Sequence, residues 1–363
     1  MNFSTNHFRS YRRIILKNQK KPTLPTKRLH KKNRSKIILL FLLPLMVLIL
    51  VAAVYFARLY ATAQNAVDLS YHTLERENKI EVNPLKETTS ILLMGIDDNK
   101  SRDLGSARAD SLIYLTINPN KHIVNMVSIP RDTYTSIIYE EQLYEKDKIN
   151  SAYSLGEEQA TIESVENLLN VPIHYYATFN FDAFLEIIDA LDGIEVDVPI
   201  TFSEQNAEGI MDQIYLEKGL QTLNGEEALA LARTRKIDND VKRGERQQLL
   251  IQAITKKALK VGSITKYSDA ITAVGTNMRT DIRFKDMLGI AQTGLDGKYE
   301  FESYVFDWTD FELNGASMVE VYPDSLEFIS HRLRVSLDLD ATDERDEPDF
   351  TFQTNGLSTY YSN

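Results

Sequence analysis

The sequence lacks cysteine altogether: none occurs among its 363 residues. This absence excludes disulfide bonds, thiol nucleophiles and zinc sites built from thiolates. The fold must therefore be held together by a hydrophobic core. Hydrophobic residues make up 43% of the chain, which is enough for such a core in a domain of this size.

Histidine is scarce and scattered, at positions 7, 30, 72, 122, 174 and 331. No HExxH pattern is present, and no serine stands in the strand–turn–helix setting of a nucleophile elbow. The sequence therefore does not indicate a zinc peptidase or a hydrolase with a catalytic triad. We expect His174, beside Tyr175 and Tyr176, to be a strand residue.

Acidic residues are missing from residues 1–36, which carry 12 Lys and Arg. The remainder, 37–363, holds 29 basic and 52 acidic residues, a formal net charge of −23. Such an acidic region lacks the basic footprint of a nucleic-acid-binding domain, so we expect no nucleic acid among the partners. The basic segment instead predicts a cytoplasmic tail, since positively charged flanks stay inside.

A single long apolar run follows this tail. Ile37–Ala57 contains no charge over 21 residues, which is long enough to cross a bilayer as a helix. Because no small-residue cleavage site follows closely, we predict an uncleaved, single-pass anchor with its N-terminus inside. We expect residues 58–88 to form a stalk or linker, residues 89–337 to form an extracytoplasmic domain, and the polar, acidic residues 338–363 to form a mobile tail.

Strands and helices alternate in the predicted domain. Apolar runs predict strands at 90–96, 111–117, 122–129, 173–179, 194–198 and 299–306. Helical spacing of apolar residues predicts helices at 157–170, 182–191, 225–235, 244–261, 265–276 and 284–293. Together they predict an α/β fold, a three-layer α/β/α sandwich with a mixed central sheet, preceded by one N-terminal transmembrane helix.

The segment Leu229–Leu250 concentrates cationic and amide side chains inside this acidic region: Arg233, Arg235, Arg243, Arg246 and Gln247. Guanidinium groups bind phosphate oxygens in pairs and keep their charge at every relevant pH, so the cluster predicts a pyrophosphate site. The alternative is a solvated basic face that pairs with Asp238, Asp240 and Glu245.

Local signals place this cluster on two helices. Asn224 and Glu227 form a capping box that starts a short helix, and Arg233 and Arg235 leave from its C-terminal end. A second helix begins near residue 243, and its first turns place several side chains on one face: Arg243, Arg246, Gln247 and Leu250.

Two carboxylates follow or precede neighbouring strands. Asp97 ends the first strand and Asp110 precedes the second, so both can emerge at one edge of the sheet, where a Mg²⁺ ion would bridge protein and phosphate. The alternative is that both are ordinary cap or turn residues. A later strand ends at Pro130, which interrupts the strand's hydrogen bonding and directs Arg131 and Asp132 outward.

Several blocks together carry a family resemblance: ILLMGIDD, ARADSLIYLTINP, SIPRDTY, KINSAYSLG, LDGIEVDV, LNGEEALALARTR and the D-x-x-R-x-x-RQQ pattern ending at Gln248. In this order, over about Ser90 to Ile254, the chain resembles the LytR-CpsA-Psr family. The resemblance implies an enzyme that attaches wall glycopolymers, such as teichoic acids or capsular polysaccharides, from a polyprenyl-pyrophosphate carrier to peptidoglycan at the membrane of a Gram-positive type envelope.

The resemblance also implies roles for single residues. Asp97 and Asp110 match its Mg²⁺ ligands, Arg131 matches its catalytic position, and Asp240 matches an acidic residue that orients arginines. Its pyrophosphate-binding positions match Arg108, Arg131, Arg233, Arg235, Arg243, Arg246 and Gln247. Two positions depart from the family pattern, Asn99 and Ala109, and neither removes a charge that the mechanism needs.

These roles imply phosphotransfer. In such a reaction the protein mainly positions the reacting groups and neutralises the charge of the phosphates. A peptidoglycan hydroxyl would attack the sugar-linked phosphate, with Asp132 or Asp240 accepting its proton. The carrier's apolar tail needs a slot, which Phe181, Phe184 and Ile188 would line unless they only pack in the core. Two alternatives stay open: a hydrolase of polyprenyl-pyrophosphate lipids, and a membrane-anchored regulator of the cell wall or of gene expression.

Overall fold

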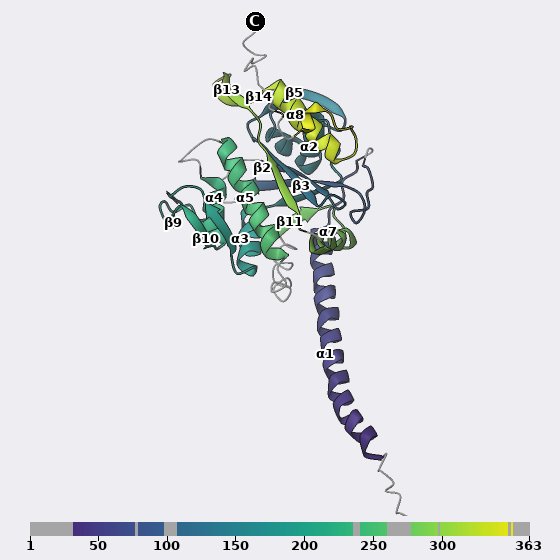
Figure 1. Ribbon diagram of the computed structural model, residues 1–363. Helices are drawn as coiled ribbons and strands as arrows, with labels where there is room; N and C mark the ends of the chain where they lie inside the picture. The colour runs from purple at the N-terminus through teal and green to yellow at the C-terminus, as the bar shows by residue number, and fades with distance from the viewer. Residues whose placement is uncertain are drawn as a thin grey trace, which may run out of the picture. The chain divides into compact units, whose positions relative to one another are not determined.

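The computed structural model describes residues 32–76, 79–97, 107–234, 240–259, 277–296, 298–347 and 350. The chain divides into two units, Met1–Phe56 and Ala57–Asn363. The second unit contains every strand described below and is the one relevant to a functional site (Figure 1).

One long helix, α1 (Lys32–Ser70), contains the apolar run predicted to span a membrane. Within it, Leu45–Ser70 includes a stretch with a mean hydropathy of 2.0, long and apolar enough to cross a bilayer. The helix is therefore compatible with a single-pass anchor. Its final turns belong to the second unit, where Ala63, Ala66 and Val67 are buried and the Tyr60 ring meets the Phe284 ring edge-on at 5.1 Å.

A six-stranded sheet forms the centre of the second unit, in the order β11-β6-β1-β2-β3-β12. The strands are β11 (Met278–Thr280), β6 (Tyr175–Phe179), β1 (Thr89–Asp97), β2 (Arg108–Asn118), β3 (Ile123–Ile129) and β12 (Glu300–Tyr304). The β1–β6 and β3–β12 pairs are parallel, whereas the other three pairs are antiparallel. The sheet is thus mixed, as predicted.

Helices cover both faces of the sheet because its side chains are apolar on both faces. Leu92, Tyr114 and Val127 share one core with α2 (Ser151–Leu169) and α8 (Pro323–Ser336). Ile91 and Met126 belong to another, against which α5 (Asp240–Ala258) and α7 (Phe284–Asp296) pack (Figure 1). Each of these buried side chains contributes about 1.5–3 kcal/mol. The three-layer α/β/α sandwich is confirmed.

A smaller layer of short elements lies beside the sheet and has its own core. Its elements are α3 (Phe181–Ala190), β7 (Ile194–Val198), β8 (Phe202–Glu204), β9 (Ile214–Leu216), β10 (Gly219–Leu223) and α4 (Gly225–Arg233). The core includes Phe184, Val196, Leu223 and Leu229, and Leu250 of α5 joins it. This shared core fixes α4 and α5 against each other.

The structure adds elements that the sequence patterns did not predict: the hairpin of β4 (Tyr134–Tyr139) and β5 (Gln142–Lys148), that of β13 (Trp308–Leu313) and β14 (Ala316–Val321), the strands β8 to β11, and α8. Helix α2 starts at Ser151, earlier than predicted, with a kink at Gly156 and Glu157. The helix predicted at 265–276 lies outside the described residues.

The start of the predicted C-terminal tail is folded against α8. A short 3₁₀ helix, η2 (Glu344–Asp346), follows α8 in the chain. The Asp340 carboxylate accepts a hydrogen bond from the Arg334 guanidinium at 2.8 Å. Residues 338–347 therefore differ from the mobile tail expected from their polar composition, because their carboxylates pair with arginines of α8. Residues 351–363 lie outside the described part of the chain.

Candidate functional site

An irregularity between β1 and β2 fixes the direction of one predicted metal ligand. Gly95 pairs with Ser111 and Ile96 pairs with Ala109, so Asp110 is the extra residue of a β-bulge. A bulge reorients one side chain relative to the regular alternation of a strand. At this point a Cβ on Gly95 would come within 3.1 Å of the Ser111 Cβ, so glycine lets the two strands approach closely.

Arg131 lies immediately beyond β3 and is bracketed by two carboxylates. Its Nη1 donates to Oδ1 of Asp110 at 2.7 Å, and its Nε lies 3.6 Å from Oδ2 of Asp132. Lys148, the last residue of β5, places its Nζ 2.8 Å from Oδ1 of Asp132. The four side chains thus alternate in charge, and each carboxylate limits where the Arg131 guanidinium lies.

Backbone hydrogen bonds hold the same segment on two sides. The N–H of Asn150 donates to the Arg131 carbonyl at 3.2 Å, and the N–H of Ile149 donates to the Thr133 carbonyl at 2.8 Å. From β14, the N–H of Val319 donates to the Asp132 carbonyl at 2.9 Å. The catalytic candidates Arg131 and Asp132 therefore lie on a segment held between the KIN motif (Lys148–Asn150) and β14.

The two arginine-bearing helices form as their sequence signals predict. The Asn224 side chain accepts from the Glu227 N–H and the Glu227 side chain accepts from the Asn224 N–H, which confirms the capping box at the start of α4. Helix α5 then runs close to β3. A Cβ on Gly244 would overlap the side chain of Ser128, so the glycine permits this close approach.

The first turns of α5 contact both α4 and the sheet. Gln247 donates from Nε2 to the Ala232 carbonyl at 3.2 Å, and its Oε1 accepts from the Ser111 hydroxyl at 2.8 Å. Arg243 donates from Nη2 to the Asp110 carbonyl at 3.3 Å. These bonds connect the arginine helices to the bulge, so Asp110, Arg243 and Gln247 belong to one site.

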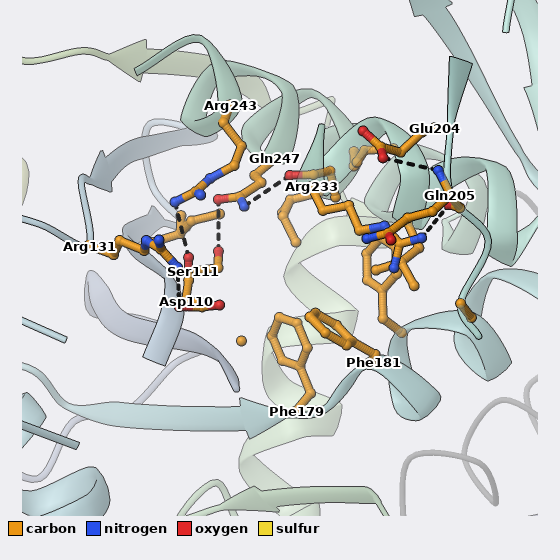
Figure 2. Close-up of a pocket in the computed structure, with 18 residues that line it drawn as sticks. Asp110, Ser111, Arg131, Phe179, Phe181, Glu204, Gln205, Arg233, Arg243 and Gln247 are labelled. Atoms are coloured by element: carbon orange, nitrogen blue, oxygen red, sulfur yellow. Dashed lines mark hydrogen bonds and ion pairs between the residues drawn. The ribbon is translucent and has the colours of Figure 1, made fainter. Parts of the chain in front are cut away.

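A cavity of about 350 Å³ opens between these elements. Figure 2 shows Asp110, Arg131, Arg243 and Gln247 gathered on one side, and Arg233, Glu204 and Gln205 on the other. Phenylalanine rings form an apolar wall together with aliphatic side chains: Phe179, Phe181, Phe184, Ile113, Leu229 and Leu250. An apolar cavity with a few convergent polar groups is the usual form of a ligand site.

The structure brings five of the predicted residues together in the lining: Asp110, Arg131, Arg233, Arg243 and Gln247. Asp132 contacts Arg131 from beside the cavity. Of the three residues considered for the apolar slot, Phe181 and Phe184 line the cavity, whereas Ile188 is fully buried in the neighbouring core.

Other predicted residues lie elsewhere or are not described. Arg246 is buried outside the lining and donates to the carbonyls of Leu231 and Thr234, at 3.1 and 2.6 Å. Arg108 is exposed on β2. Arg235 lies outside the described residues, as do the side chains of Asp97 and Asp240, whose backbones belong to β1 and α5.

Sequence reasoning missed three contributors to this site. Lys148 holds Asp132, Ser111 binds Gln247, and Glu204 lines the cavity from β8. The KIN motif was a signal for Lys148. Glu204 had no comparable signal, because β8 is only three residues long and neighbours a polar loop.

His174 has a structural environment, but it lies just before a strand and not within one as predicted. It precedes β6, and its Nδ1 accepts from the Ser90 N–H at 3.0 Å and lies 2.7 Å from the Ser90 hydroxyl. Burial and the positive charge of Arg76 lower the pKa of His174 to about 4. Neither His174 nor Ser90 lines the cavity.

A group that could hold a metal ion occurs away from the cavity, at the C-terminal end of the described chain: His331, Asp343 and Asp346. Its carboxylates also pair with arginines, Asp343 with Arg345 at 2.6 Å and Asp346 with Arg332 at 2.8 Å. Hydrogen bonds from Arg345 hold the pKa of Asp343 far below its usual range. The group is thus at least an ion-pair network that fastens residues 340–346 to α8.

Comparison with known proteins places this chain in a family. The LytR_cpsA_psr family model matches residues 57–334. The polyisoprenyl-teichoic acid--peptidoglycan teichoic acid transferase TagU of Bacillus subtilis (strain 168) is 34% identical over 315 residues, which cover 85% of this chain and 98% of TagU.

Two solved structures extend the likeness to the fold. TagT bound to LIIa-WTA matches with a TM-score of 0.62 at 30% identity, covering 74% of this chain and 99% of that chain. YwtF (TagT) with bound octaprenyl pyrophosphate lipid matches with a TM-score of 0.58 at 28% identity, again covering 74% and 99%. The chain belongs to the LytR-CpsA-Psr family.

Proposed function

We propose that this protein transfers an anionic glycopolymer, of the teichoic acid or capsular polysaccharide type, from a polyprenyl-pyrophosphate carrier to peptidoglycan. The observation that carries the proposal is one cavity with an arginine-rich polar part and a phenylalanine-lined apolar wall. A polyprenyl pyrophosphate has the same two parts. The name of TagU and the octaprenyl pyrophosphate bound to YwtF (TagT) support this assignment.

The pyrophosphate would bind among the cationic and amide groups of the lining. Arg131 and Arg243 approach it from the side of Asp110, and Arg233 approaches from the end of α4. Their planar guanidinium groups suit paired phosphate oxygens, and Gln247 adds an amide donor. From the family resemblance we also assign pyrophosphate contacts to Arg108 and Arg235, whereas we assign Arg246 a supporting role.

Mg²⁺ is the cofactor that we propose for this site. The carboxylate oxygens of Asp110, and of Asp97 at the end of the paired strand, are the hard ligands that Mg²⁺ prefers. When bound, the ion supplies positive charge that neutralises phosphate oxygens. Arg131, which donates to Asp110, keeps that carboxylate pointed at the cavity.

In the proposed reaction, a hydroxyl oxygen of peptidoglycan attacks the phosphorus that is bonded to the glycan. A new P–O bond forms, the P–O bond to the bridging oxygen breaks, and polyprenyl phosphate leaves with the electron pair. The hydroxyl proton passes to Asp132 or Asp240. Arg131, held between Asp110 and Asp132, would stabilise the negative charge that develops on the phosphate oxygens.

We propose a single-pass membrane arrangement with residues 1–36 in the cytoplasm and the catalytic domain outside. The apolar helix and the basic segment before it support this orientation. Proteolysis of right-side-out vesicles tests it: a protease added outside should cleave within residues 58–363 and leave the N-terminal tail intact. Protection of the whole chain would contradict the arrangement.

The deciding experiment is transfer of a radiolabelled glycan from its polyprenyl-pyrophosphate carrier to peptidoglycan by the full-length protein in detergent with Mg²⁺. Coupled product from the wild type, absent in Arg131→Ala and Asp97→Ala variants, would support both the transferase and its site. Release of free phosphoglycan without coupling would instead favour a lipid hydrolase. No turnover by a folded protein would favour the membrane-anchored regulator.

A further inference from the structure

An acidic side chain lies in the part of the cavity away from Arg131. Glu204 ends β8, is 5% exposed, and its Oε1 accepts from the Gln205 N–H at 3.0 Å. Figure 2 places Glu204 and Gln205 beside Arg233 and apart from Asp110. Among the described lining residues, Asp110 and Glu204 are the two carboxylates, and Asp110 already has the proposed metal and Arg131 beside it.

The charge of Glu204 limits what binds next to it. An ionised carboxylate accepts hydrogen bonds and donates none, and it repels the oxygens of a pyrophosphate. The apolar chain of a polyprenyl carrier offers a carboxylate no hydrogen-bond donor. The remaining part of the proposed substrate is the sugar bonded to the pyrophosphate, whose hydroxyl groups are donors.

The position of Glu204 is fixed by the structure around it. In the β8–β9 pair, Phe202 faces Leu216 and both are buried in the core of the smaller layer. The Ala207 N–H donates to Oε2 of Glu226 at 2.7 Å, and Arg233 donates to the carbonyls of Gln205 and Asn206. These contacts tie the residues that follow β8 to α4, so Glu204 presents its carboxylate from a rigid frame.

We infer that Glu204, together with the side-chain amide of Gln205, binds hydroxyl or amide groups of the sugar unit attached to the pyrophosphate and so helps to select the glycan that is transferred. The inference rests on the proposed function and adds a specificity-determining residue to it. It assigns the cavity two tasks: phosphate binding between Asp110 and Arg233, and sugar recognition beside Glu204 and Gln205.

The test compares two ligands of the full-length protein in detergent: octaprenyl pyrophosphate, which has no sugar, and octaprenyl pyrophosphate that carries a saccharide. Glu204→Gln keeps the shape of the side chain and removes its charge. We expect it to weaken binding of the saccharide lipid, and to lower its kcat/KM for transfer, by about tenfold, because a hydrogen bond to a charged group is lost. Binding of octaprenyl pyrophosphate should stay within about twofold of the wild type.

The matched control is Glu195→Gln, the same charge change on the exposed side of β7. It should alter neither ligand's binding. Gln205→Ala serves as a second variant if Glu204→Gln does not fold, since it keeps the carbonyl that Arg233 contacts. Gln205→Ala should also weaken binding of the saccharide lipid and leave binding of octaprenyl pyrophosphate unchanged.

Three outcomes would overturn the inference: equal weakening of both lipids by Glu204→Gln, tighter binding of both, or no change in either. The first would indicate a role in the frame alone, and the second would place the carboxylate beside the pyrophosphate. If the wild type binds neither lipid, the proposed function itself fails, which is a different result from a variant that treats the two lipids alike.

Discussion

Nη1 of Arg131 donates to Oδ1 of Asp110 across 2.7 Å, joining the segment that follows β3 to the bulge of β2. The contact combines a proposed catalytic cation and a proposed metal ligand in one hydrogen-bonded pair. Because Asp132 approaches the same guanidinium from the other side, the geometry of this group depends on the planar fork of arginine.

Replacing Arg131 by lysine should therefore be almost as harmful as replacing it by alanine. A lysine ammonium keeps the charge but lacks the planar fork that Asp110 and Asp132 bracket. We expect both variants to lose about 100-fold or more in transfer rate, the range for removing one preorganised donor to a developing oxyanion. The glycan transfer assay measures this, with thermal unfolding to confirm the fold. A lysine variant with a third of wild-type activity would show that charge alone suffices.

Lys148 offers a milder change to the same group. Lys148→Gln removes the cation 2.8 Å from Asp132, so Asp132 should shift toward Arg131 and draw its guanidinium away from the phosphate. We expect kcat to fall by about tenfold with KM for the lipid changing less, and Lys148→Arg to recover most of the rate. Steady-state kinetics of the three proteins provide the comparison. An unchanged kcat in Lys148→Gln would mean that Asp132 is held well enough without it.

Arg246 allows a pyrophosphate contact to be distinguished from a structural brace. Only 3% of it is exposed, and it donates to the Leu231 and Thr234 carbonyls at the C-terminal end of α4. Arg246→Ala leaves these carbonyls without that donor, so we expect the free energy of unfolding to fall by about 2–4 kcal/mol. Urea unfolding measures this loss. Normal stability combined with weak lipid binding would instead make Arg246 a ligand of the pyrophosphate.

The stability of the domain should depend on the protonation of His174. Its pKa is lowered from 6.5 to about 4 in the folded state, mainly by burial, so the unfolded chain takes up this proton first as the pH falls. The effect is absent above pH ~7, grows as the pH drops through 6.5, and reaches about 3 kcal/mol of lost stability near pH 4.

Urea unfolding at pH 7.5 and pH 4.5 tests this dependence. His174→Asn offers an amide oxygen to the Ser90 N–H without a titratable ring and should show a smaller loss between the two pH values. Carboxylates affect both proteins alike, so the difference between them reports on His174. An identical loss in both proteins would rule out the histidine as its source.

Most of the central sheet was predictable because strands such as β1 and β2 are apolar runs that need burial on both faces. Its edge strand β11 was not predicted, because it is only three residues long and includes an arginine. The Asn224–Glu227 capping box was predictable because it is a local hydrogen-bonding pattern. By contrast, β5 is polar, and six of its seven residues are exposed, so no alternation marked it as a strand. Hydrophobic periodicity reports burial, and an exposed hairpin has little of it.

The candidate site shows the same division between local and long-range information. The sequence placed Arg243 and Arg246 on one helix face, yet Arg243 lines the cavity while Arg246 binds the end of α4. The spacing of residues along a helix predicts which face a side chain lies on, but it does not predict which neighbouring group that side chain contacts. Glu204 was missed for a related reason, since its place in the cavity depends on how β8 packs beside α4.

The hydrogen bond from Val319 to Asp132 determines when the site can be completed as the chain is made. All the arginines proposed here lie before residue 250, so a growing chain acquires them early. The strand that clamps the Arg131–Asp132 segment emerges only with residues 316–321, and β12 closes the edge of the sheet shortly before. A nascent chain therefore carries every proposed catalytic side chain before it carries the strand that holds the Arg131–Asp132 segment in place.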